Sequence, residues 1–180
     1  MVVLGIDPGV NNLGWCVTSS NGSIIEWGLL TETLTDLKKP DYIRIFKKRI
    51  KPLIRTLNSY TVDNDHKPDL IMERYMPRGM RKGNQTERIN ILIGYLLGKV
   101  KYSDVFMVPA SSWKNHREKN YMTVDNNTIP DHMVDSYTMT LYLLERIKGR
   151  ISVREVIQKM KKVDRTDYGW KFKRRIWVHE

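Results

Sequence analysis

The first 30 residues place the strongest constraint on the fold, because they contain three strand-like segments in quick succession. These segments cover residues 1–7, 13–19 and 23–30. The second and third are joined by Ser20-Asn21-Gly22, and Asn-Gly is a strong signal for the tight turn between two antiparallel strands. The chain is therefore expected to begin with three antiparallel strands, against which the later elements must pack.

The rest of the chain alternates predicted helices and strands. A long amphipathic helix is expected over residues 40–58, and Pro52 is expected to kink or divide it. The later elements are expected, in chain order, as a strand at 68–73, a helix at 86–100, a strand at 104–108, an irregular stretch at 109–127 and a long helix from about Thr128. This order predicts an α/β fold with a five-stranded mixed sheet flanked by helices.

The charge balance indicates the kind of partner. The chain has 31 Lys and Arg against 20 Asp and Glu, and its net charge of +11 favours a polyanion, with nucleic acid ahead of a membrane surface. A length of 180 residues is most simply one domain with a real core. The sequence shows neither a signal peptide nor an apolar run of about 20 residues, so we expect a soluble cytoplasmic protein. Cys16, the only cysteine, is expected in the core rather than as a nucleophile.

Two carboxylates end predicted buried strands. Asp7 closes an apolar run, and the Pro8-Gly9 pair that follows prevents the strand from continuing. Glu73 closes a second apolar run. Both residues have other interpretations: the glycine turn after Asp7 could cradle a phosphate or be an ordinary turn, and Glu73 could form an ion pair with Arg74.

A histidine and an aspartate lie three residues apart at the start of the last predicted helix. His132 and Asp135 should therefore project from one face of it. The preceding Thr128 and Asp131 fit a capping box, which gives Asp131 a structural role. If the fold gathers these acidic groups, cations between them would relieve their repulsion. The candidate catalytic and metal-binding residues are Asp7, Glu73, His132 and Asp135.

Basic and aromatic residues gather in three places, as binding of a nucleic acid requires. A basic loop directly after Glu73 contains Arg78, Arg81 and Lys82. The second cluster consists of Trp113, Lys114, His116, Arg117 and Lys119. The third is the segment 168–177, in which aromatic residues alternate with cations.

The predicted helix 86–100 has two apolar faces. One face should cover the sheet, and the opposite face carries Ile91, Gly94, Tyr95 and Gly98 instead of charged residues. Small residues on that second face permit close approach of another backbone. We therefore expect it to pack either on a partner subunit or on another helix of the same chain.

Three motifs together resemble the RuvC family of Holliday junction resolvases. They are the opening Gly5 to Trp15, the strand end Glu73-Arg74 and the late His132 to Asp135, and the order of elements is similar from residue 1 to about 148. The resemblance implies an RNase H-like fold, a homodimer, and two Mg²⁺ or Mn²⁺ ions in each site. By position the four ligands would be Asp7, Glu73, His132 and Asp135. Some family members have aspartate in place of the histidine, so Asp131 is a reserve ligand.

The chain departs from the family at its expected DNA contacts. The family usually has an aromatic residue three positions after the glutamate, where this chain has Met76 with Tyr75 beside it. Residues 113–127 replace a glycine-containing basic segment, which makes Lys114 and Lys119 stand-ins for the family's DNA-contacting lysines. The expected DNA contacts are therefore Tyr75, Met76, Arg78, Arg81, Lys82, Lys114 and Lys119. Residues 1–150 are expected to form the nuclease domain, and 151–180 a basic aromatic extension that is not a separate domain.

The resulting expectation is a metal-dependent, structure-selective DNA endonuclease. It would resolve four-way junctions by paired symmetric nicks, leaving 5′-phosphates. One alternative is a broader debranching nuclease that cuts flaps, three-way junctions and forks, and another is a junction-binding protein without catalysis. The Asp7-Pro8-Gly9 turn also looks like the first phosphate loop of actin/hexokinase-type ATPases, but 180 residues are too few for their second domain.

Overall fold

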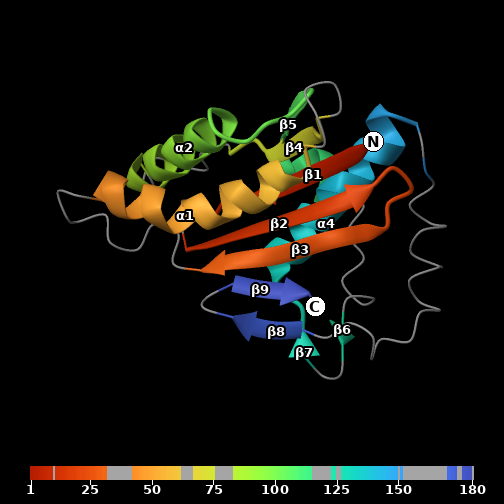
Figure 1. The fold of residues 1–180 in the computed structure, drawn as a ribbon. Coiled ribbons are helices and arrows are strands. Elements are labelled where there is room, and N and C mark those ends of the chain that lie inside the picture. The colour runs from red at the N-terminus through yellow and green to blue at the C-terminus, as the bar shows by residue number, and fades with distance from the viewer. Residues whose placement is uncertain are drawn as a thin grey trace.

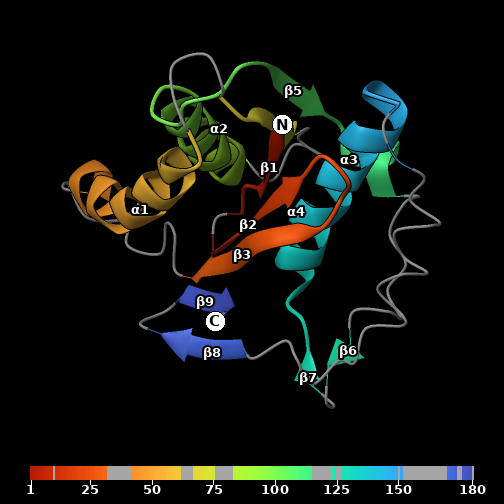
Figure 2. The same cartoon turned by 45° about the vertical axis from the view of Figure 1, so that its right-hand side comes forward.

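A central β-sheet with helices on both faces forms the fold (Figure 1). The computed structural model describes residues 1–9, 11–31, 42–61, 67–75, 83–114, 123–124, 127–149, 151, 170–173 and 176–179. Helices α1 (Tyr42–Ser59) and α2 (Gly83–Leu97) cover one face of the sheet, and α4 (Asp131–Tyr142) lies against the other (Figures 1 and 2). No helix in the described ranges is long and apolar enough to cross a bilayer.

The five strands expected from the sequence all form, and they make a mixed sheet. They are β1 (Val2–Asp7), β2 (Asn12–Ser19), β3 (Ile24–Thr31), β4 (Asp69–Glu73) and β5 (Val105–Val108). The first three are antiparallel neighbours, whereas β4 runs parallel to β1 and β5 runs parallel to β4. The prediction of a five-stranded mixed sheet flanked by helices is confirmed.

Two further strands extend this sheet beyond β3. Strand β9 (Ile176–His179) pairs antiparallel with β3, and β8 (Trp170–Lys173) pairs antiparallel with β9. The described sheet therefore has the order β5-β4-β1-β2-β3-β9-β8. The sequence favoured nucleic-acid binding for this segment, but its alternation of aromatic and charged residues is also the period of a strand.

Two local expectations were wrong, and a third was wrong in part. Helix α1 is not divided at Pro52, which lies inside it and is exposed; a kink at this residue stays a prediction. The stretch 109–127 is not all irregular, because it contains α3 (Ala110–Trp113), β6 (Thr123–Val124) and the start of β7 (Asn127–Thr128). Thr128 belongs to β7, and α4 begins at Asp131 after Pro130 with no side-chain cap, so the predicted capping box does not form.

The core is divided by the sheet into two sides. On one side, alternate residues of the strands, such as Leu4 and Ile6, pack against α1 and α2. On the other side α4, continued by the π-helical turn η4 (Leu143–Ile147), packs against the remaining strand residues. Cys16 lies fully buried on the α4 side, and burial raises the pKa of its thiol, as expected of a core residue rather than a nucleophile.

Candidate metal-binding site

Asp7 and Glu73 end neighbouring parallel strands. Gly5 of β1 lies opposite Ile71 of β4, and both strands end two residues later, at Asp7 and Glu73. Adjacent strands are about 4.8 Å apart, and side chains alternate between the two faces of a sheet. Ile71 packs on the α4 side, so alternation directs both carboxylates to that side as well. Asp7 is buried and Glu73 is half-buried.

Two glycines allow α4 to lie unusually close to these strands. A Cβ on Gly5 would lie 2.2 Å from the carbonyl oxygen of Ser136, and a Cβ on Gly14 would lie 1.9 Å from the carbonyl oxygen of His132. Any side chain at either position would therefore collide with the helix backbone. Because Gly14 lies opposite Asp7 in the β1–β2 pairing, this contact sets the first turn of α4 beside the end of β1. This positioning role was not predicted from the sequence, although a glycine inside a strand signals close backbone approach.

His132 and Asp7 are in direct contact. Nδ1 of His132 lies 2.5 Å from Oδ2 of Asp7, although the two residues are 125 positions apart in the sequence. This hydrogen bond raises the pKa of His132; burial opposes the rise, and the charges of Asp7, Asp135 and Asp131 add to it. The raised pKa of His132 indicates that the electrostatic potential at the end of β1 is negative.

The other two candidate ligands lie near this pair. Asp135 follows His132 on α4 and is buried, at 9% exposure, with its charge acting on the His132 imidazole. Glu73 ends the strand beside Asp7. Within the described residues, which include all four candidates, no three His, Cys, Asp or Glu side chains converge closely enough to hold one metal ion. The structure thus joins Asp7 to His132 and brings Asp135 and Glu73 to the same edge of the sheet without forming a closed ligand cluster.

The chemistry of these donors fits a hard divalent cation. Three carboxylates and one imidazole are oxygen-rich ligands of the kind that Mg²⁺ and Mn²⁺ prefer. Asp7 and Asp135 are both mostly buried, at 7% and 9% exposure, and burial of two carboxylates is costly without a compensating positive charge. The raised pKa of His132 favours its protonated, cationic form beside these carboxylates, and a divalent cation would supply positive charge in its place.

The expected DNA contacts are only partly described. Tyr75 is half-buried and packs against the core on the α1–α2 side, and Lys114 is exposed with its Nζ 5.5 Å from the centroid of the Trp113 ring. Trp113, expected on a nucleic-acid surface, is instead fully buried, so that assignment was wrong. The remaining expected contacts, which lie outside the described residues, are Met76, Arg78, Arg81, Lys82 and Lys119.

Comparison with known proteins finds similarity in structure alone. No protein-family model and no curated protein sequence matches the chain. Among solved structures, T. thermophilus RuvC in complex with a Holliday junction substrate matches with a TM-score of 0.58 at 17% identity, over 83% of this chain and 98% of that chain. A second structure of Thermus thermophilus RuvC matches over the same shares, with a TM-score of 0.49 at 16% identity. The match to the junction complex shows that this chain has the RNase H-like fold of RuvC, as the sequence predicts.

Proposed function

We propose that the protein is a metal-dependent DNA endonuclease that cuts four-way junctions. The observation that carries this proposal is the contact of Asp7 with His132 at the end of β1, beside the strand that ends at Glu73. The net charge of +11 supports a polyanionic substrate. The matched T. thermophilus RuvC structure contains a Holliday junction substrate, which supports the same substrate class here.

Asp7, Glu73, His132 and Asp135 would hold two Mg²⁺ or Mn²⁺ ions. Such a pair of ions, when bound, supplies positive charge to the scissile phosphate and lowers the pKa of a water molecule that attacks it. Asp7 fixes the imidazole of His132 through Nδ1, which would leave Nε2 either to ligate an ion or to position that water. Asp135, buried on the next turn of α4, adds negative charge that favours cation binding at this edge of the sheet.

We infer that two copies act together. A four-way junction is nearly two-fold symmetric, so a homodimer would place two sites for paired nicks that leave 5′-phosphates. Tyr95 packs on Phe46 of α1 in the same chain, with ring centroids 5.2 Å apart, so this part of the second face of α2 is satisfied internally. Gly94 is exposed, with no described atom within 4 Å of the position that a Cβ would take, and offers a close approach to a partner helix. Sedimentation of the protein as a monomer at the concentration used for cleavage would contradict the proposed homodimer.

The domain assignment and the DNA contacts belong to the same proposal. Residues 1–150 would form the nuclease domain. Residues 151–180 would be an extension and not a separate domain, and the pairing of β9 with β3 supports this assignment of the extension. Tyr75 and Lys114 are proposed DNA contacts within the described residues. The other proposed contacts, which lie outside the described residues, are Met76, Arg78, Arg81, Lys82 and Lys119.

The proposal is tested with an Asp7→Asn variant and a labelled four-way junction. We expect the variant to lose cleavage in Mg²⁺ and to bind the junction as well as, or more tightly than, the unmodified protein in EDTA. Asp104→Asn is the matched control, because Asp104 is exposed and precedes β5. Since β5 runs parallel to β4 and β1, Asp104 lies at the N-terminal ends of these strands and Asp7 at their C-terminal ends. Full cleavage by Asp7→Asn would overturn the proposed site.

The same gel separates the alternatives. Matched duplex, flap, three-way junction and fork substrates are compared with the four-way junction in Mg²⁺ and in EDTA. Equal cutting of all branched substrates would identify a general debranching nuclease. Tight junction binding without Mg²⁺-dependent nicks would identify a protein that binds junctions but does not cut them.

A further inference from the structure

Helix α1 is strongly basic along its whole length. It contains six cations and no acidic residue, namely Arg44, Lys47, Lys48, Arg49, Lys51 and Arg55. A helix that only faces solvent usually mixes charges of both signs, because pairs of opposite charge four residues apart stabilise it. The one-sided composition of α1 therefore gives this helix a positive electrostatic potential that favours binding of an anion.

A groove of about 510 Å³ lies between α1 and α2. Five cations line it, four from α1 and one from the residues after α2: Lys47, Lys48, Lys51, Arg55 and Lys99. All five are exposed, and none of them forms an ion pair with any residue in the described ranges. Their positive charge is thus uncompensated by the parts of the chain that the structure describes.

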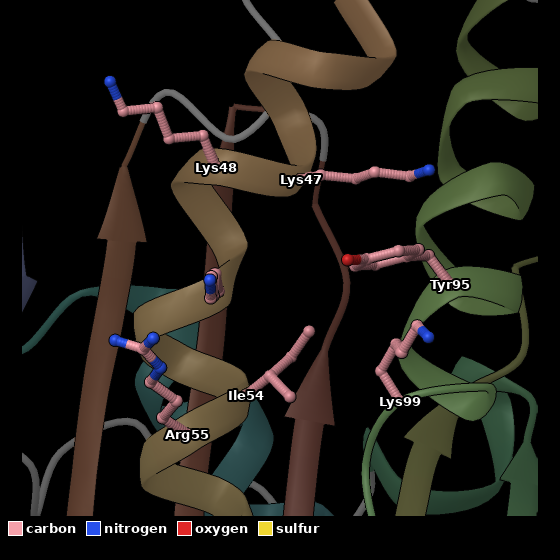
Figure 3. A pocket seen from close by; sticks show the side chains of 7 residues that line it. Lys47, Lys48, Ile54, Arg55, Tyr95 and Lys99 are labelled. Carbon is pink, nitrogen blue, oxygen red and sulfur yellow. The ribbon is translucent and has the colours of Figure 1, made fainter.

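The groove also has a fixed aromatic wall. The ring of Tyr95 packs edge-to-face on Phe46, with centroids 5.2 Å apart, and is held half-buried between the helices. Figure 3 shows Lys47 extending from α1 toward α2 and Tyr95 extending from α2 toward α1, with Lys99 beside the tyrosine. Phenolic hydroxyl and ammonium groups are donors of the kind that bind phosphate oxygens. The contact with Phe46 holds the tyrosine ring in place, and the phenolic hydroxyl adds a donor to the cations of the groove.

The spacing of the cations suits an extended polyanion better than a single small anion. Lys47, Lys51 and Arg55 follow one another at intervals of four residues, which places them about 6 Å apart along the helix axis and on one side of it. The row is about 12 Å long, and one strand of B-DNA presents a phosphate every 3.4 Å or so of its axis. A row of this length can contact several successive phosphates. A second copy of the chain is a poor occupant, because it would bring its own cations against these.

The groove lies on the opposite face of the sheet from Asp7. Leu4 and Ile6 of β1 pack on the α1–α2 side, whereas Asp7 is directed to the α4 side. Strands β1 and β3 are parallel, so their C-terminal ends lie at the same end of the sheet. Helix α1 follows β3 and precedes β4, and so it leads from that end back to the end at which β4 starts. Lys47 is therefore nearer the candidate site than Arg55, and the row of cations leads away from the site along the other face.

We propose that this groove binds the phosphodiester backbone of the DNA substrate, as a second contact outside the candidate site. This inference rests on the proposed function, because it takes DNA as the substrate. The contact is independent of base sequence, since its donors reach phosphate oxygens and not base edges.

The test compares two variants that lose equal charge. Lys47→Gln/Lys51→Gln removes two cations of the groove, and Lys67→Gln/Arg146→Gln removes two that lie outside its lining. Binding of a labelled four-way junction is measured by fluorescence anisotropy in EDTA over a range of KCl concentrations. The plot of log affinity against log salt should become shallower by about 1.8 for the groove variant, because each lost phosphate contact contributes about 0.9. For the control variant the slope should change by less than one phosphate contact, about 0.9.

Equal slopes for the two variants would overturn the inference. Unchanged junction binding combined with lost binding to vesicles of anionic phospholipid would also overturn it, and would assign the groove to a membrane surface. Thermal melts of both variants establish that they fold, since every changed groove residue is exposed. Because binding is measured in EDTA, a protein that never cleaves DNA would fail the proposed function while leaving this result intact.

Discussion

The close packing of α4 on the sheet predicts that Gly14→Ala damages both the fold and the site. The added Cβ would lie 1.9 Å from the carbonyl oxygen of His132, whereas ordinary contact begins at 3.4 Å. Strand and helix must therefore separate by about 1.5 Å, and a backbone obstacle cannot rotate away. Overpacking of this kind costs up to about 3 kcal/mol, which lowers the melting temperature of a chain of this size by roughly 6–12 °C.

The same displacement should break the contact between Asp7 and His132. Their hydrogen bond is 2.5 Å long, and a shift of about 1.5 Å takes the pair beyond hydrogen-bond distance. The assay combines a thermal melt followed by circular dichroism with an NMR titration of the His132 ring. We expect a lower melting temperature together with a His132 pKa that falls back toward its ordinary value of about 6.5.

Gly94→Ala is the matched control for this substitution. It adds the same methyl group to an exposed position of α2, where no described atom lies within 4 Å of the new carbon. Alanine favours a helix over glycine, so this variant should be more stable by about 0.5–1 kcal/mol when the melt is run at a protein concentration too low for copies to associate through α2. A melting temperature for Gly14→Ala no lower than that of Gly94→Ala would refute the close approach of α4 to β2.

Two further predictions concern charged groups. In the metal-free protein the pKa of His132 should lie above about 6.5, and it should be lower in Asp7→Asn. The stability that this pair contributes is therefore fully present below the pKa of the unfolded state and is lost as the pH rises through the pKa of the folded state. A His132 pKa at or below about 6.5, measured by NMR in the unmodified protein, would contradict this prediction. Lys148→Met should cost about 3 kcal/mol in urea denaturation, because it removes the partner, at 3.1 Å, of the buried Asp69. Arg146→Met removes an exposed cation that pairs with the half-buried Glu145, and it should cost less than about 1 kcal/mol. Equal costs for the two variants would show that burial of Asp69 does not set the cost of losing its partner.

The strands of the sheet could be predicted because their signals are local. The apolar runs that end at Asp7 and Glu73 are typical of strands buried on both faces of a sheet, and the Asn21-Gly22 turn predicts the hairpin of β2 and β3. Strands β8 and β9 were missed for the opposite reason. Alternation of aromatic and charged residues is typical both of a nucleic-acid surface and of a strand. The strand interpretation depends on β3 having an edge with which the segment can pair, and the sequence of the segment does not contain that information.

The start of α4 shows where local signals give way to tertiary pairing. Thr128 and Asp131 have the spacing of a capping box, yet Thr128 pairs with Thr123 in a short two-stranded sheet. Pairing with β6 makes Thr128 a strand residue, and the helix begins after Pro130 instead. Trp113 likewise lies beside cations in the sequence, but its large apolar surface is buried in the core.

The candidate site could be predicted as a set of residues but not as a geometry. Asp7 and Glu73 stood out as carboxylates at strand ends, and His132 and Asp135 as a pair on one helix face. Their meeting depends on the approach of α4 to the sheet, which the absence of side chains at Gly5 and Gly14 permits. The close approach of α4 depends on how the surfaces of the helix and the sheet fit together, and it cannot be predicted from the sequence pattern of the helix or of the strands alone.

The pairing of β3 with β9 has a consequence for the order in which the protein folds. Leu29 pairs with Trp177, so the two strands are joined only after almost 150 intervening residues have been organised. Closure of so long a loop costs entropy that local hairpins avoid, and β1 to β3 should therefore form early and the outer hairpin late. During that interval the edge of β3 is open to strands of other molecules, so refolding at high concentration should favour aggregation.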